Sequence, residues 1–299
     1  MRRGGLALLL LCLAACRERS NADRQALAMR DDTLPVLVGA GDIANCETGG
    51  DYATARILDT IRGTVFVAGD AAYVTKRHPL PFQQCYAPTW GRHFARTRPV
   101  PGNHDYDGES ATPYFEYFGA GATPPRGYYS YDLGTWHVLA LNTSAAITDS
   151  SEELRWLRAD LASHPGHCAI AYMHHPRFSS GPHEQRERIA PLWNTLQRYG
   201  VSVAIAGHDH IYERFAPLDS AGHSDPDSGV RQFVVGTGGA RRYDVGALLA
   251  GSEAHSTRDF GVLKLTLLAD RYRWDFIPVT PGGFHDRGQS RCHPTHAVP

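Results

Sequence analysis

Lysine is almost absent from this chain. Only Lys76 and Lys264 occur among the 30 basic residues of the 299-residue sequence, and no function follows from this shortage. Positive and negative residues nearly balance, and the formal net charge is −1. Since nucleic-acid-binding proteins usually carry a basic excess or a basic stripe, the composition indicates no nucleic acid partner. After Asp32 the sequence contains no internal repeat and no low-complexity linker.

The N-terminus has the features of a secretory targeting segment. Arg2 and Arg3 give it a positive start, and Gly4 to Ala15 form a nearly unbroken apolar run that ends in small residues. A run of this length is too short to span a bilayer. Residues 1–15 are therefore predicted to be a signal peptide, which implies an exported protein.

The segment Leu13-Ala14-Ala15-Cys16 resembles the bacterial lipobox. In that pattern the chain is cut before the cysteine, so the resemblance implies a bacterial lipoprotein with a membrane lipid anchor at Cys16. A plain signal peptide with an incidental cysteine is the alternative. Residues 17–32 are polar and charged, and we expect residues 16–35 to form a tether. A lipoprotein retained in the inner membrane often has Asp at the position of Arg17, so Arg17 favours anchoring in the outer membrane. The protein would then face the periplasm or the cell surface.

Four cysteines follow the predicted tether, at positions 46, 85, 168 and 292. An even number of cysteines in an exported protein favours disulfides. We expect Cys46 to pair with Cys85 and Cys168 with Cys292, since each pair could fasten a loop to the body. The sequence does not fix this connectivity, and buried free thiols are the alternative.

From Val36 onward, short apolar runs alternate with helical stretches, as is typical of an α/β domain. The predicted strands are 35–40, 64–68, 128–132, 136–142, 169–173, 201–206, 232–235, 262–267 and 272–278. The predicted helices are Tyr52–Ile61, Glu152–Ser163 and Glu184–Tyr199, and Ser151 is well placed to cap the second. Because helices and strands mix throughout, residues 36–299 are predicted to form one domain.

Five short polar clusters interrupt this pattern. Four directly follow strand-like apolar runs, and the third follows the short Pro99-Val100-Pro101. They are Gly41-Asp42, Gly69-Asp70-Ala71-Ala72-Tyr73, Gly102-Asn103-His104-Asp105, Met173-His174-His175-Pro176 and Gly207-His208-Asp209-His210. In open α/β sheets, ligands bind beyond the carboxyl ends of strands, and a preceding glycine permits a tight turn and close backbone approach. We therefore expect these clusters to come together at one site.

As possible ligands, the clusters offer two carboxylates, one phenol, one amide and three imidazoles. A hard trivalent cation prefers anionic oxygen donors, whereas imidazole suits zinc, iron and similar ions. Such a mixed set suits two neighbouring cations that share a carboxylate. Two-metal sites hold their ions about 3.5–4 Å apart, clamp a phosphoryl oxygen and provide hydroxide near neutral pH.

In this order, the five clusters resemble those of the calcineurin-like metallophosphoesterase superfamily, and Gly69-Asp70-x-x-Tyr73 is similar to its purple acid phosphatase branch. The resemblance runs from about Val36 to Val279. It implies an α/β fold with two mixed β-sheets sandwiched between helices, in four layers (αββα), and a catalytic domain over residues 36–299.

The resemblance also implies two metal sites that share one carboxylate. The first would hold ferric iron through Asp42, Asp70, Tyr73 and His210. The second would hold divalent zinc, iron or manganese through Asp70, Asn103, His174 and His208. His104 matches the family's proton donor, and His183 loosely matches a histidine that contacts the substrate in relatives.

One difference between branches supports this assignment. Many metallophosphoesterases open with Asp-x-His, and that His binds the first metal. Here Ile43 and Ala44 follow Asp42, so no such His is available, and Tyr73 supplies the missing donor.

The resemblance implies a hydrolase of small phosphate monoesters, in which metal-bound hydroxide attacks phosphorus and His104 protonates the leaving group. A phosphodiesterase acting on cyclic nucleotides or glycerophosphodiesters is the alternative, because pocket shape decides between them, and the loops 75–98 and 105–126 are expected to set that shape. A non-catalytic surface protein that binds phosphate is a third hypothesis. It is disfavoured because all seven ligands and His104 are present.

Overall fold

The computed structural model describes residues 33–298 apart from 75–76, 78, 107–109 and 184–185. The predicted signal peptide, Cys16 and most of the predicted tether lie outside the described residues, as does the start of the third predicted helix at Glu184. Residues Val36–Pro299 form one compact unit. Within the described residues, none of the helices has the length and apolar character needed to cross a membrane.

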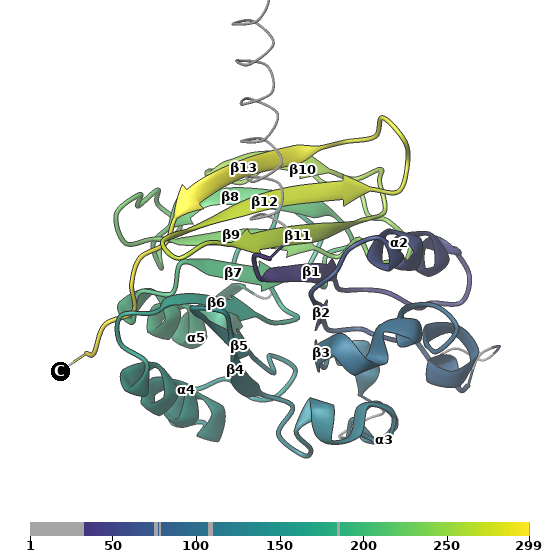
Figure 1. Cartoon of the computed structure of the whole chain (residues 1–299), viewed down its shortest axis with the longest axis horizontal. Helices are drawn as coiled ribbons and strands as arrows, with labels where there is room; N and C mark the ends of the chain where they lie inside the picture. The colour runs from purple at the N-terminus through teal and green to yellow at the C-terminus, as the bar shows by residue number, and fades with distance from the viewer. Residues whose placement is uncertain (1–32, 75–76, 78, 107–109, 184–185, 299) are drawn as a thin grey trace, which may run out of the picture. The chain divides into compact units, whose positions relative to one another are not determined.

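Strands dominate this unit (Figure 1). They are β1 (Val36–Ala40), β2 (Thr64–Ala68), β3 (Thr97–Val100), β4 (Tyr129–Leu133), β5 (Trp136–Ala140), β6 (Cys168–Tyr172), β7 (Val203–Ala206), β8 (Tyr212–Leu218), β9 (Val230–Val235), β10 (Ser252–Ser256), β11 (Gly261–Leu267), β12 (Arg271–Pro278) and β13 (Asp286–Arg291). One sheet has the order β13-β12-β11-β1-β2-β3 and the other β10-β8-β9-β7-β6-β5-β4. Both sheets are mixed, because β1 and β7 have parallel neighbours while β12 and β8 have antiparallel ones.

Helices lie outside the sheets. The α-helices are α2 (Gly50–Asp59), α3 (Thr112–Phe118), α4 (Glu152–Ser163) and α5 (Arg186–Arg198), and the shorter helical turns are η1 (Phe82–Tyr86), η2 (Trp90–Arg96), η3 (Asn103–Asp105) and η4 (Gly119–Ala122). The predicted cap of α4 is confirmed, since Ser151 Oγ accepts a hydrogen bond from the backbone N–H of Leu154 at 3.4 Å.

The alternation of side chains along the strands builds the layers. In β6, Ile170 and Tyr172 point into the core between the two sheets, whereas Ala169 and Ala171 pack toward α4 and α5. Helix α2 lies on the other side, against the six-stranded sheet (Figure 1). The order is therefore helix, sheet, sheet, helix, and the predicted architecture of two mixed sheets between helices is confirmed.

Every strand and helix predicted from the sequence is present, with ends that differ by a few residues. The sequence pattern missed β3, β8, β10, β13 and α3. Strands β10 and β13 are sheet edges, and their residues alternate between exposed and partly buried without an apolar run. The regions 75–98 and 105–126, expected to be loops, instead contain short helical elements that pack aromatic rings such as Phe82, Tyr86 and Phe118 against one another.

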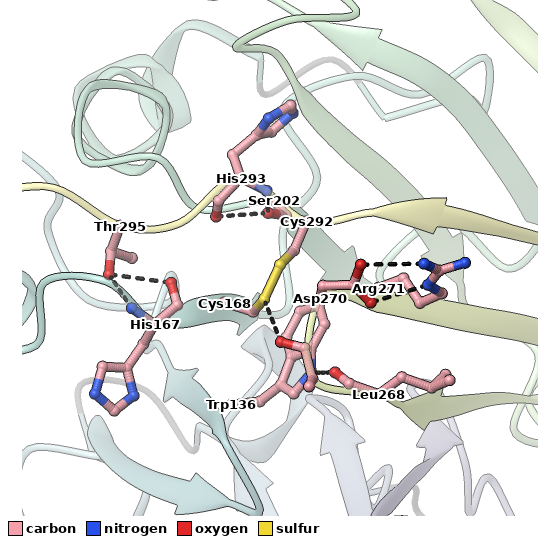
Figure 2. Close-up of a disulfide and its surroundings, with 11 residues drawn as sticks. Trp136, His167, Cys168, Ser202, Leu268, Asp270, Arg271, Cys292, His293 and Thr295 are labelled. Carbon is pink, nitrogen blue, oxygen red and sulfur yellow. Dashed lines mark hydrogen bonds and ion pairs between the residues drawn. A yellow bond between two sulfur atoms is a disulfide. The ribbon is translucent and has the colours of Figure 1, made fainter.

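Both predicted disulfide pairings are confirmed. Cys46 bonds to Cys85, with 5.5 Å between their Cα atoms, and Cys168 bonds to Cys292, with 5.6 Å between theirs. The second bond joins the start of β6 to the residue that follows β13, and so links the two sheets (Figure 2). The segment after Cys292 continues along β6, where the backbone N–H of Thr295 donates to the carbonyl of His167 at 2.7 Å.

Candidate metal centre

The five polar clusters lie at the carboxyl ends of β1, β2, β3, β6 and β7. Backbone hydrogen bonds join them across both sheets. The N–H of Asp42 donates to the carbonyl of Gly69 at 3.1 Å, and that of Gly207 donates to the carbonyl of His174 at 3.0 Å. The N–H of Gly41 donates to the carbonyl of Val235 at 2.9 Å, so segments separated by more than a hundred residues in sequence meet at one place.

Gly69 is required for this close approach. Its φ angle is +77°, and a Cβ atom there would lie 2.4 Å from Nδ1 of His174. A side chain at position 69 would be strained by its backbone conformation and would displace the His174 ring. The glycine before Asp70 thus allows β2 and β6 to bring their polar residues together.

The first group of side chains comprises Asp42, Tyr73 and His210. The hydroxyl of Tyr73 lies 3.0 Å from Oδ1 of Asp42 and 3.2 Å from Nε2 of His210, and this Nε2 atom is 3.2 Å from the same carboxylate oxygen. Nδ1 of His210 lies 2.5 Å from the carbonyl oxygen of Arg241. Because a carbonyl only accepts, Nδ1 carries the hydrogen, and Nε2 is left facing two oxygen atoms.

The second group comprises Asp70, Asn103, His174 and His208. Nε2 of His174 lies 3.3 Å from Oδ2 of Asp70, 3.0 Å from Oδ1 of Asn103 and 3.2 Å from Nδ1 of His208. Nδ1 of His174 is fixed in the same way as that of His210, since it lies 3.0 Å from the carbonyl oxygen of Ala68.

These distances fit two cations. Two donors that each lie about 2.1 Å from one ion are about 3.0–3.4 Å apart at octahedral or tetrahedral angles, and the contacts in both groups range from 3.0 to 3.3 Å. Ligand atoms of Asp42, Asp70 and His174 all lie within 4.8 Å of one another. Asp70 thus lies between the two groups, where a shared carboxylate is needed.

Burial makes the charges of this site costly. Asp42, Asp70 and His174 are at most 1% exposed. Burial opposes ionisation of both Asp70 and His174, but their mutual attraction lowers the pKa of Asp70 and raises that of His174 to about 9. Burial and the carboxylates of Asp42 and Asp70 raise the pKa of Tyr73.

His104 and His183 lie at the rim of the two groups. His104 is exposed, its ring is centred 4.7 Å from that of Tyr73, and its backbone N–H donates to Oδ1 of Asp70 at 2.8 Å. The ring of His183 is 4.5 Å from that of His208, and its Nδ1 is 2.7 Å from Oδ1 of Asp209. The side chain of His183 is 38% exposed, so both imidazoles can be reached from solvent.

For three residues near the site, the sequence indicated either no role or only a general one. Tyr243 stacks on His210 with ring centroids 4.0 Å apart and planes 9° apart, and no motif marked it. The carboxylate of Asp105 accepts the N–H groups of Ala71, Ala72 and Gly102, as expected of a residue that fixes loops. His175, adjacent to His174, has its Nδ1 3.0 Å from Oγ1 of Thr143, and a ring nitrogen of His175 lies within 4.8 Å of ligand atoms of His174 and His208.

The fold is that of a metallophosphoesterase. Residues 36–212 match the calcineurin-like phosphoesterase family, and the chain belongs to this family. It is 28% identical over 228 residues to purple acid phosphatase 21 of Arabidopsis thaliana, over 68% of this chain and 49% of the plant protein. It is 22% identical over 315 residues to the probable inactive purple acid phosphatase 1 of the same plant, over 89% of this chain and 49% of that protein.

A solved structure agrees on the fold. The purple acid phosphatase PPD1 from yellow lupin (Lupinus luteus) seeds matches with a TM-score of 0.70 and 19% identity, over 86% of this chain and 53% of that chain. This chain thus spans about half the length of these relatives. At this level of identity, the structural likeness shows a common fold.

Proposed function

We propose that this chain is a dinuclear metal-dependent phosphoesterase that hydrolyses phosphate monoesters, as an acid phosphatase of the purple type. The orientation of His174 and His210 supports this proposal most directly. A backbone carbonyl fixes Nδ1 of each ring, so that Nε2 of each faces carboxylate, phenol or amide oxygen atoms. Buried electron-pair donors that face one another require a positive charge among them.

We assign ferric iron to the first site and a divalent zinc, iron or manganese ion to the second. Asp42, Asp70, Tyr73 and His210 would hold the first ion, and Asp70, Asn103, His174 and His208 the second. Anionic oxygens suit the trivalent ion, and imidazoles suit the divalent one. When bound, the two ions would neutralise charge on the phosphoryl group and lower the pKa of a coordinated water molecule.

The rim residues would then act on the substrate. His104 is exposed beside Tyr73, so its imidazole can donate a proton to the oxygen of the leaving alcohol. General acid catalysis of this kind typically contributes about 10²–10⁴-fold. His183, which Asp209 orients, would contact the phosphate or its substituent.

A phosphodiesterase could use the same donors, so the walls of the pocket would decide the substrate class. Regions 75–98 and 105–126 leave the site directly after Tyr73 and His104 and are the candidates for these walls. The third hypothesis, a non-catalytic phosphate-binding protein, is disfavoured because the predicted ligand side chains converge in two groups.

We also propose that the protein is exported and anchored by a lipid at Cys16, in the outer membrane. The lipobox-like segment motivates this proposal, and the two disulfides suit an oxidising compartment outside the cytosol.

Absorption spectra of iron-loaded protein test the ferric site. A ferric ion bound to the phenolate of Tyr73 should give a visible charge-transfer colour, and Tyr73→Phe should remove it while also weakening retention of the first-site metal. Tyr243→Phe is the matched control and should keep the colour, because Tyr243 stacks on the ring of His210, whereas the hydroxyl of Tyr73 lies against Oδ1 of Asp42.

Metal analysis and a panel of aryl and alkyl monoesters, aryl diesters and cyclic nucleotides complete this test. Two metal ions per chain and preference for monoesters are expected. If iron-loaded protein is colourless and fully active with two divalent ions, Tyr73 does not bind ferric iron, and the diesterase hypothesis gains support. If it binds metal but turns over no ester, the proposed activity is wrong.

A further inference from the structure

A second cluster of histidines and carboxylates lies at the opposite end of the seven-stranded sheet. His137 is near the start of β5, where it pairs with Ala169 of the parallel strand β6. His174 follows the other end of β6, five residues beyond Ala169, which corresponds to about 16 Å along the strand. The cluster around His137 is therefore separate from the candidate metal centre.

His137 contacts a carboxylate with each ring nitrogen. Its Nδ1 lies 2.9 Å from Oδ1 of Asp132 in β4, and its Nε2 lies 2.6 Å from Oδ2 of Asp160 in α4. Oδ1 of Asp160 accepts a hydrogen bond from Ser130 Oγ at 2.8 Å, which holds this carboxylate in place. A histidine that binds a metal through one nitrogen almost always donates its other N–H to such an anchored acceptor.

His164, at the end of α4, presents a second imidazole. Its ring stacks on that of His137, with centroids 3.9 Å apart. Nδ1 of His164 lies 2.7 Å from the backbone carbonyl oxygen of Asp160 and therefore carries the hydrogen. The lone pair of Nε2 is left for another partner, so His164 also has the hydrogen-bonding pattern of a metal-binding histidine.

A third imidazole borders the cluster. The ring of His167 is 6.0 Å from that of His164, and its buried Nδ1 has no hydrogen-bond partner among the described residues. The His167 ring points away from the Cys168–Cys292 disulfide (Figure 2).

We propose that Asp132, His137 and His164 form a further metal site that binds one zinc-like divalent ion. Ligand atoms of the three residues lie within 4.8 Å of one another, and zinc favours a few imidazole and carboxylate donors. The ion would replace the hydrogen between His137 Nδ1 and Asp132. The planes of the His137 and His164 rings are 17° apart, and imidazoles bind metal through lone pairs that lie in the ring plane, so the His164 ring would have to turn to direct Nε2 at the ion. Water or His167 would complete the coordination. It would join the β4–β5 hairpin to the end of α4, a structural role that does not depend on the proposed phosphoesterase activity.

The test is the zinc content of the purified protein after the dinuclear centre has been saturated. Wild type should bind one more equivalent of Zn²⁺ than His164→Ala and Asp132→Asn, and the extra equivalent should raise its unfolding temperature. His223→Ala is the matched control, since His223 is an exposed histidine that contacts a single carboxylate, that of Asp219, at 3.3 Å. It should bind as much zinc as wild type.

Asp160→Asn tests the orienting carboxylate, and it should weaken binding of the extra ion by roughly 10–100-fold. Circular dichroism and phosphoester turnover should be unchanged in His164→Ala, which separates loss of this site from loss of the fold. Equal zinc content in wild type and His164→Ala would overturn the proposal, and the cluster would then be an imidazolium held between two carboxylates. That result would leave the proposed phosphoesterase function untouched, because the comparison is independent of turnover.

Discussion

Replacement of Glu153 by Gln should change how the stability of the protein depends on pH. Glu153 lies in the first turn of α4 and is only 3% exposed. One carboxylate oxygen accepts the backbone N–H of Asn142 at 2.7 Å, and the other has no partner among the described residues. Burial raises the pKa of Glu153 from 4.5 to about 8, although the hydrogen bond from Asn142 opposes this shift.

The size of the effect follows from proton linkage. Between pH 4.5 and pH 8, the folded carboxyl keeps a proton that the unfolded chain has lost, so stability falls as pH rises through this window. For one group with these two pKa values, the free energy of unfolding decreases by roughly 3 kcal/mol from pH 5 to pH 8. Glu153→Gln lacks this titration. Its free energy of unfolding should exceed that of wild type by about 1 kcal/mol at pH 5 and by roughly 4 kcal/mol at pH 8.

Urea unfolding at pH 5 and pH 8, at equal metal content and with both disulfides oxidised, measures this difference. Other titrating groups are shared by the two proteins and cancel in the comparison. Glu152→Gln is the control, because the Glu152 side chain is 67% exposed and its surface ion pair with Arg126, at 3.3 Å, is worth at most about 1 kcal/mol. If Glu153→Gln and wild type lose stability in parallel, the buried carboxyl does not hold its proton as described.

Three further predictions concern the site and the anchor. His104→Ala should keep its metals and lose about 10²–10⁴-fold in turnover, most for alkyl phosphates, whose leaving groups need the proton; an equal loss for nitrophenyl phosphate would contradict an acid role. Gly69→Ala, whose Cβ would meet the His174 ring at 2.4 Å, should lose second-site metal by elemental analysis, and normal metal content would show that the ring can move. Expressed in bacteria, wild type should take up labelled fatty acid and fractionate with membrane, whereas Cys16→Ser should do neither; label on the variant would exclude this anchor.

The candidate site could be predicted from the sequence because its residues follow predicted strands. Asp42, Asp70, His174 and His208 each follow an apolar run within two or three residues, and strands were predicted there. Parallel strands present their carboxyl ends at one edge of a sheet, so sequence position fixed which end of the molecule these side chains occupy. The same logic made the inner strands predictable, since both of their faces are buried.

What the sequence did not reveal depends on contacts between distant residues. Tyr243 stacks on His210 from a segment without strand or motif, and Asp132, His137 and His164 come together only because the β4–β5 hairpin packs beside the end of α4. Edge strands such as β13 have one unpaired side and need no apolar run. Such elements carry no local signal, because their neighbours rather than their own residues determine them.

The backbone at the candidate ligands supports the view that the fold itself holds them in place. Asp42, Asp70 and His208 have φ angles of +61°, +49° and +71°, although each follows a glycine that could adopt this conformation at less cost. Left-handed backbone at a non-glycine residue costs on the order of 1–3 kcal/mol and concentrates at functional sites. At Asp42 the turn directs Oδ2 to the backbone N–H of His208 at 2.8 Å, and Gly207 is needed because a Cβ atom there would lie 2.6 Å from this oxygen. The carboxylate is therefore positioned by hydrogen bonding and close packing, so that a cation would find its donors already oriented.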